Sequence, residues 1–229
     1  TASPEATAAA VAILEAGGNA IDAAVAAAFT VGVADLDSSG LGGMTYAVIR
    51  LADGRSVAID GTPPTPLAVD PERLRSLPRG ERLFGHEMAA VPTTLAALEM
   101  ARERYGSMTL ARLIAPAIAV AERGYRLNPS QIVWSNVYFE LLLRSGYLRL
   151  IALDDGSLVG RPADEDAAIG RPGDLRCRPE LAATLRLIQE RGVSVFYLGE
   201  IADRIDADMV AHGGFVRKAD LAMLRVREV

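Results

Sequence analysis

The chain has 229 residues, half of them hydrophobic, which is enough to bury a sizeable core and excludes a disordered protein. Its net charge of -5 and its scattered arginines argue against a nucleic-acid-binding protein, because such proteins gather basic residues on one face. The most apolar stretch, residues 7–33, is interrupted by Glu15, by glycines and by Asp22, well short of a membrane span. We therefore expect one soluble domain over residues 1–229.

Two helices are predicted at the start of the chain, over residues 4–16 and 20–33. Gly17 and Gly18 suit the left-handed conformation that ends a helix, and Asn19 suits the N-cap of the next one. Asp22, three residues later, completes a variant of the capping box. The second helix carries an apolar stripe at helical spacing that needs a core to bury it: Ile21, Ala24, Val25, Ala28 and Phe29.

A β-hairpin is predicted next, with strands over residues 45–51 and 56–60. Asp53 and Gly54 lie between these two β-rich runs, and Asp-Gly in that place is a strong hairpin signal. Residues 61–71 contain four prolines, which cannot continue a hydrogen-bonded ladder. We predict that this segment leaves the second strand as an extended loop.

The rest of the chain reads as mainly helical. Thr109 is a predicted N-cap for a helix that Gly124 ends, and Gly192 ends another helix that starts after Pro179. Residues 154–178 are rich in Asp, Glu, Gly and Pro and lack periodicity, so we predict an exposed connection there. Further helices are predicted over residues 94–104, 129–143 and 199–211.

The histidines and the cysteine of this chain show no pattern of a metal or redox site. His86 and His212 are not spaced with Cys or acidic partners as metal ligands are, so we predict no metal site. Cys177 is the only cysteine and cannot form an internal disulfide. The chain opens at Thr1 without a signal-like segment, so the compartment stays open, with cytoplasmic favoured over secreted.

Two further groups of polar residues precede the hairpin. Ser38 and Ser39 lie beside glycines but not in a Gly-x-Ser-x-Gly elbow, and two isolated histidines do not make a Ser-His-Asp triad, so we interpret this segment as a tight turn. Asp35 and Asp37 could be paired carboxylates, yet acids just before a turn commonly cap backbone N–H groups. We therefore expect no glycosidase-type acid–base chemistry here.

Two segments resemble the gamma-glutamyltranspeptidase family: residues 17–26, GGNAIDAAVA, and residues 39–43, SGLGG. In the family, Val stands at the position of Ile21 and Gly at that of Met44. The resemblance continues in order along the chain through further landmarks, at residues 90–92, 105–110, 116–118, 122–125, 196–199, 213–214 and 220–221.

The resemblance implies an α+β fold, the four-layer αββα sandwich of N-terminal-nucleophile hydrolases, in which this chain is part of the large subunit. It also implies a precursor that cuts itself, after which the new N-terminal Thr of the small subunit attacks an acyl substrate, with its own α-amine as base. The catalytic residue then lies on the partner and none lies in this chain, since Thr1 stands where the family begins its first helix. No cofactor is implied.

The loop after the hairpin departs from the family pattern. The family has Asp-x-Arg-Glu-x-Ala-Pro here, and its Arg holds the α-carboxylate of the γ-glutamyl group. In this chain Thr62 stands at the Arg position and Pro63 at the Glu position. A Thr cannot replace a guanidinium, and losing a charged partner typically costs about 2–5 kcal/mol of binding. We expect Gly61, Thr62 and Pro63 to line a substrate site of altered acyl specificity.

The resemblance therefore favours a self-processing acyl hydrolase that acts on a small molecule other than an ordinary γ-glutamyl compound. Relatives with such roles include cephalosporin acylases, oxamate amidohydrolases and homologues in lincosamide and pyrrolobenzodiazepine antibiotic biosynthesis. Two alternatives stay open. One is a conventional glutathione hydrolase or transpeptidase in which another Arg compensates, and the other is a non-catalytic homologue that acts as a scaffold.

Overall fold

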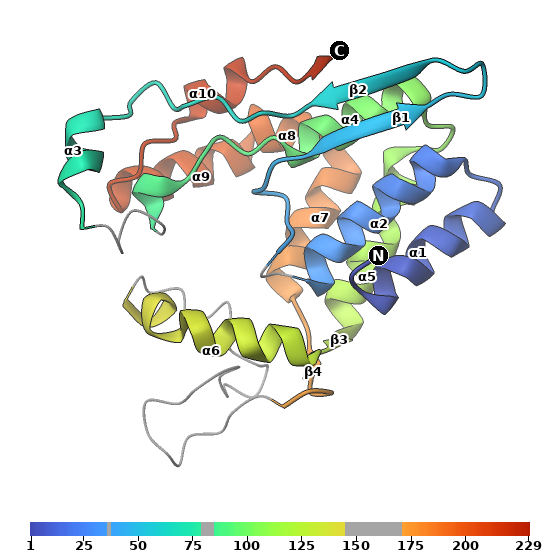
Figure 1. Cartoon of the computed structure of the whole chain (residues 1–229), viewed down its shortest axis with the longest axis horizontal. Helices are drawn as coiled ribbons and strands as arrows, with labels where there is room; N and C mark the ends of the chain where they lie inside the picture. The colour runs from blue at the N-terminus through green and yellow to red at the C-terminus, as the bar shows by residue number, and fades with distance from the viewer. Residues whose placement is uncertain (36–37, 79–84, 145–170) are drawn as a thin grey trace.

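The computed structural model describes residues 1–35, 38–78, 85–144 and 171–229 of the chain. The long helices in these ranges are shown in Figure 1. They are α1 (Pro4–Glu15), α2 (Ala20–Ala34), α4 (Thr94–Tyr105), α5 (Leu110–Arg123), α6 (Pro129–Arg144), α7 (Pro179–Arg191) and α9 (Glu200–Ala211). Shorter helical segments are α3 (Pro71–Ser76), η2 (His86–Met88), α8 (Ser194–Tyr197) and α10 (Lys218–Met223).

Strands form two small antiparallel units. In the first, β1 (Tyr46–Arg50) pairs with β2 (Ser56–Asp60), and β2 pairs with the short β5 (Arg227–Glu228) near the end of the chain. The second unit joins β3 (Tyr125–Arg126) to β4 (Leu175–Arg176). Figure 1 shows the first unit lying over α4, so the hairpin has one covered face and one open face.

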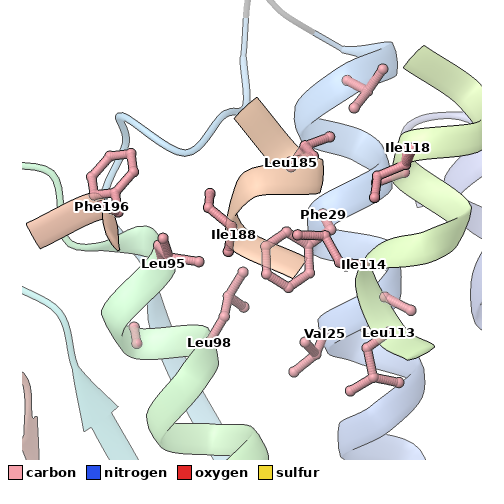
Figure 2. Packing of buried hydrophobic residues seen from close by; sticks show 14 of the residues in the cluster. Val25, Phe29, Leu95, Leu98, Leu113, Ile114, Ile118, Leu185, Ile188 and Phe196 are labelled. Carbon is pink, nitrogen blue, oxygen red and sulfur yellow. The ribbon is translucent and has the colours of Figure 1, made fainter. Parts of the chain in front are cut away.

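The core lies mainly among the helices, with the hairpin packed on one side of it. Phe29 from α2, Leu98 from α4, Ile114 from α5 and Ile188 from α7 point into one cluster (Figure 2). All four side chains are at most 7% exposed. The sheet contributes its covered face to this cluster through Ile49 and Ile59. Burial of this apolar surface is the main force that holds the hairpin on the helices.

The start of the chain follows the sequence prediction with two corrections. Asn19 caps α2 and forms the predicted capping box with Asp22, and Gly17 has a φ of 88°. Gly18 does not adopt the left-handed conformation; it is needed because a Cβ there would lie 2.7 Å from Ile13. The predicted stripe is also wrong at Ala24, which is exposed. Because α1, α4 and α5 all pack on α2, its buried face is not the single stripe that the spacing predicted.

The polar segment before α7 differs in part from the expectation of an exposed connection. Residues 145–170 lie outside the described residues, but Leu175 and Arg176 form β4 and pair with β3. Arg176 is only 5% exposed. Two-residue strands carry too little periodicity to be detected from a sequence pattern, which explains why this pairing was not predicted.

Candidate functional site

The glycine-rich turn at residues 39–43 meets the start of α4. The carbonyl of Gly43 accepts hydrogen bonds from the N–H groups of Thr93 at 2.9 Å and Thr94 at 3.1 Å. These are two of the N–H groups that have no partner within a helix at its N-terminus. Two segments that are 50 residues apart in the sequence are thereby held together directly beneath the hairpin.

The same place fixes the end of β2. The Thr93 hydroxyl, which is fully buried, donates a hydrogen bond of 2.5 Å to the carbonyl of Gly61. A Cβ on Gly61 would lie 2.2 Å from the carbonyl oxygen of Thr45, so only glycine fits there. The loop that starts at Gly61 is therefore anchored by the Thr93 side chain and passes close to the Thr45 backbone.

Tyr197 supports this arrangement from α8. Its hydroxyl donates to the carbonyl of Pro92 at 3.2 Å and accepts from the N–H of Ala96 at 3.0 Å. Burial raises the pKa of Tyr197, so the hydroxyl keeps its proton and its donor role at any ordinary pH. The segment that carries Thr93 is thus held by hydrogen bonds to Gly43, Gly61 and Tyr197, which lie in three different parts of the chain.

Thr62 is exposed and ordered by Asp60. The Thr62 hydroxyl donates to Asp60 Oδ1 at 2.5 Å, and the Thr62 N–H donates to the same oxygen at 2.9 Å. The hydroxyl of Tyr46 lies 3.2 Å from that of Thr62. Pro63 is half-buried beside them. The structure therefore places the three predicted site residues directly after β2, with the Thr62 hydroxyl bonded to the last residue of that strand.

A cation lies on the other side of Asp60. Arg227 pairs with Asp60 in the sheet register, and its guanidinium donates to Asp60 Oδ2 at 3.0 Å. The side chain of Arg227 is 72% exposed and that of Asp60 is 23% exposed. The hydroxyl and N–H of Thr62, and then Arg227, hold the pKa of Asp60 below its ordinary value.

The neighbouring residue keeps Arg227 on the open face of the sheet. Glu228 accepts hydrogen bonds from the Tyr105 hydroxyl at 2.7 Å and from Arg104 at 2.6 Å, both at the end of α4. Because successive residues of a strand point to opposite faces, Arg227 is directed away from the helices. Nothing in the sequence pattern singled out Arg227, since β5 is only two residues long.

Tyr46, Asp60, Thr62 and Arg227 thus form a polar cluster, which we call the hairpin cluster, on the open face of the sheet. The cluster suits binding more than catalysis. A carboxylate with a lowered pKa is a weak base, so Asp60 is poorly suited to remove the Thr62 proton. The Tyr46 hydroxyl and the guanidinium can instead donate hydrogen bonds to an oxygen-rich or anionic group, whereas the Thr62 hydroxyl, whose proton is donated to Asp60, can accept one.

The other sequence candidates lie elsewhere. Thr1 precedes α1, and its hydroxyl donates to the carbonyl of Ser3 at 2.7 Å and lies 2.8 Å from that of Thr7. The N–H groups of Ser38 and Ser39 donate to the backbone carbonyl of Asp35, as in a turn. Asp37 lies outside the described residues.

The two histidines, in contrast, are brought together. His86 in η2 and His212 after α9 stack with their ring centroids 4.5 Å apart, and Asp208 lies beside both. The expectation that neither histidine has an acidic partner at suitable spacing is therefore wrong. The signal was present, because Asp208 precedes His212 by one helical turn.

Comparisons with known proteins show which family and fold the chain is similar to. The family model described as Gamma-glutamyltranspeptidase matches residues 6–229. The chain is 33% identical to the glutathione hydrolase proenzyme of Pseudomonas sp. (strain A14) over 225 residues, which are 95% of this chain and 37% of that protein. It is 34% identical over 235 residues to the Acylase ACY 1 proenzyme of Pseudomonas sp. (strain V22), covering 97% of this chain and 40% of that one.

Among solved structures, the gamma-glutamyltranspeptidase of Helicobacter pylori superposes with a TM-score of 0.87 at 32% identity. The match covers 100% of this chain and 64% of that chain. This likeness confirms the predicted α+β class and the N-terminal-nucleophile hydrolase fold. Within the described part of the chain, no helix has both the length and the apolar character of a membrane span.

Proposed function

Because the chain belongs to the gamma-glutamyltranspeptidase family, we propose that it is part of the large subunit of a self-processing acyl hydrolase. The chain spans about two fifths of the two proenzymes to which it is similar, which leaves room in such a precursor for a second subunit. In this proposal the first Thr of that small subunit attacks a substrate carbonyl, its α-amine acts as base, and backbone donors hold the oxyanion. Water or an amine then releases the acyl group.

The exposed side chains on the open face of the hairpin suggest that another subunit packs on it. Val48 is 83% exposed, Tyr46 is 58% exposed and Met44, just before the strand, is 59% exposed. A sheet whose one face is packed on helices and whose other face leaves large apolar side chains exposed beside the hairpin cluster suits a second packed layer. We propose that the small subunit supplies this layer and that the substrate lies between it and the hairpin cluster.

The observation that supports altered acyl specificity is the environment of Thr62. Its hydroxyl is engaged by Asp60, and Gly61 is held by Thr45 and Thr93, so the loop presents a short neutral side chain on a rigid backbone. We propose that neutral or bulkier acyl groups fit here better than a γ-glutamyl group, whose α-carboxylate would lose its charged partner. A role in antibiotic biosynthesis is consistent with such a change.

A test of the mechanism uses the full-length protein. Replacing the first Thr of the small subunit by Ala in the precursor should prevent cleavage, as seen by mass spectrometry, and abolish turnover of acyl p-nitroanilides. Normal processing with full activity in this variant would contradict the proposal. A wild-type protein that is neither cut nor active on any acyl substrate would favour a scaffold function.

A second candidate function, a conventional γ-glutamyl hydrolase, is supported by Arg227. The exposed guanidinium is one strand away from Thr62 and uses one hydrogen bond to Asp60, so several of its donors remain for a carboxylate. If Arg227 compensates for Thr62, Arg227→Gln should lower kcat/KM for γ-glutamyl-p-nitroanilide at least about tenfold, as expected when a charged partner is lost. The matched control is Arg225→Gln, because Arg225 is also exposed but donates to the backbone carbonyls of Ala222 and Leu224. Equal rates in both variants would exclude this role.

A further inference from the structure

Both histidines of the chain lie at one place outside the hairpin cluster, together with one carboxylate. His86 Nε2 is 2.9 Å from Asp208 Oδ2, and His212 Nδ1 is 3.3 Å from Asp208 Oδ1. The candidate ligand atoms of the three residues all lie within 4.8 Å of one another. Two imidazoles and a carboxylate are ligands that Zn²⁺ and its neighbours in the first transition row prefer.

The backbone around these residues is built for a close approach. Gly213 has a φ of 75°, which ends α9 and turns the chain toward η2. A Cβ on Gly214 would lie 2.5 Å from the Met209 sulfur and 2.8 Å from the carbonyl oxygen of His86. The N–H of Gly214 also donates to the carbonyl of Met209 at 2.8 Å. The approach of η2 to the end of α9 therefore depends on glycine at this position.

The electrostatic surroundings suit a cation. Asp208 and His212 lie at the C-terminal end of α9, where the helix dipole favours positive charge. The nearby cation, Arg73, makes an ion pair with Glu87 and lies over the ring of Phe215, 5.9 Å from its centroid. Its charge is therefore balanced by a partner of its own, and the Asp208 carboxylate faces the two imidazoles.

We propose that His86, Asp208 and His212 bind one divalent transition-metal ion, with Zn²⁺ as its probe. A metal bound to a histidine lies in the plane of the ring, so the two stacked rings cannot share an ion until one of them turns. The side chain of His212 is 55% exposed and would give up the contact of its Nδ1 with the Asp208 carbonyl oxygen, at 2.8 Å, in order to turn. That of His86 is only 12% exposed. Three protein ligands leave the remaining coordination positions to water or to a group from another chain.

Such an ion would join η2 to the end of α9. Its binding would tie together segments that are 122 residues apart at the His86–Asp208 contact. Because an ion that binds only the folded state stabilises it, saturating Zn²⁺ should raise the Tm of the protein. This role is independent of the acyl chemistry proposed above, so either proposal can fail without the other.

The test uses the full-length protein without a histidine tag. Calorimetric titration with ZnCl₂ should give binding in the wild type and at least about tenfold weaker binding in His86→Gln and in His212→Gln, since even supporting residues of metal sites have effects of that size. The control is Asp203→Asn, because Asp203 is on the same helix but pairs with Lys218, and it should bind Zn²⁺ as the wild type does.

A second measurement does not depend on the folding of a variant. Zn²⁺ added to the wild-type protein should shift the imidazole NMR signals of His86 and His212 together, and EDTA should restore them. Unchanged signals at saturating Zn²⁺ would overturn the proposal. So would equal Zn²⁺ affinity in the wild type and in both histidine variants.

Discussion

Asp22 joins the motif at residues 17–26 to a turn much later in the chain. Its carboxylate is fully buried and accepts hydrogen bonds from the N–H of Asn19 at 2.9 Å, from the N–H and hydroxyl of Ser107 and from the N–H of Met108. Two of the sequence landmarks, at residues 17–26 and 105–110, are therefore parts of one contact. Sequence reasoning placed Asp22 in a capping box but could not predict that a distant turn shares the same carboxylate.

Asp22→Asn should lower the free energy of unfolding by about 2–4 kcal/mol, because an amide leaves some of these buried donors without an acceptor. Burial raises the pKa of Asp22, but the hydrogen bonds from Ser107, Asn19 and Met108 outweigh it and the pKa is lowered. The carboxylate therefore stabilises the fold fully above its unfolded pKa of about 3.8 and loses this effect as the pH falls through the lower folded value.

Urea unfolding of the full-length protein at several pH values checks this prediction. Asp53→Asn is the control, because Asp53 is 52% exposed and pairs only with the neighbouring Arg55 in the hairpin turn. That variant should leave the stability nearly unchanged, because exposed ion pairs contribute little to it. If both variants lowered the free energy of unfolding equally, the buried contacts of Asp22 would not stabilise the fold as predicted.

Thr62 is the residue at which specificity should change. Thr62→Arg introduces the charge that the family resemblance implies at this position, and we expect a modest gain, of about tenfold or less, in kcat/KM for γ-glutamyl-p-nitroanilide. The gain is limited because Pro63 and Pro64 restrict how the loop presents the new side chain. Thr62→Gln, which is long but neutral, is the control. A wild-type rate equal to that of ordinary family members would contradict the prediction.

At the scale of elements, prediction succeeded where local signals are strong. The helix from Leu110 to Arg123 begins after Thr109 and ends at Gly124, and the predicted hairpin strands match β1 and β2. The site needed more than local signals. Asp60 was seen as the end of a strand, but its contact with Arg227 depends on a pairing across 167 residues. Long-range register of this kind is set by tertiary packing, which a single sequence pattern does not carry.

The junction of β2 with its loop should be sensitive to a single methyl group. Gly61→Ala places a Cβ 2.2 Å from the Thr45 carbonyl oxygen, which requires the strands to separate. We expect a loss of about 1–3 kcal/mol in stability together with reduced activity. Gly42→Ala is a matched control, because nothing lies within 4 Å of the added Cβ. Thermal unfolding and kcat/KM of both variants check this, and an unaffected Gly61→Ala protein would show that the loop is not rigidly held.

At the scale of the whole molecule, the open face of the hairpin predicts that this chain does not fold well by itself. Residues 1–229 expressed alone should give aggregated or molten material, because exposed Val48 and Tyr46 lie on a small sheet that lacks its second layer. Circular dichroism and size-exclusion chromatography check this. A cooperative unfolding transition of a monomeric isolated chain would contradict it.

The most direct test of the central claim is to trap the acyl-enzyme. The full-length protein is mixed with an excess of an activated acyl ester, quenched in acid within the first turnovers and analysed by mass spectrometry of the separated subunits and their peptides. We predict two chains, with this one unmodified and the acyl group on the first Thr of the other. Turnover by an uncut protein, or an acyl group bound to Thr62 or any other residue of this chain, would contradict the account.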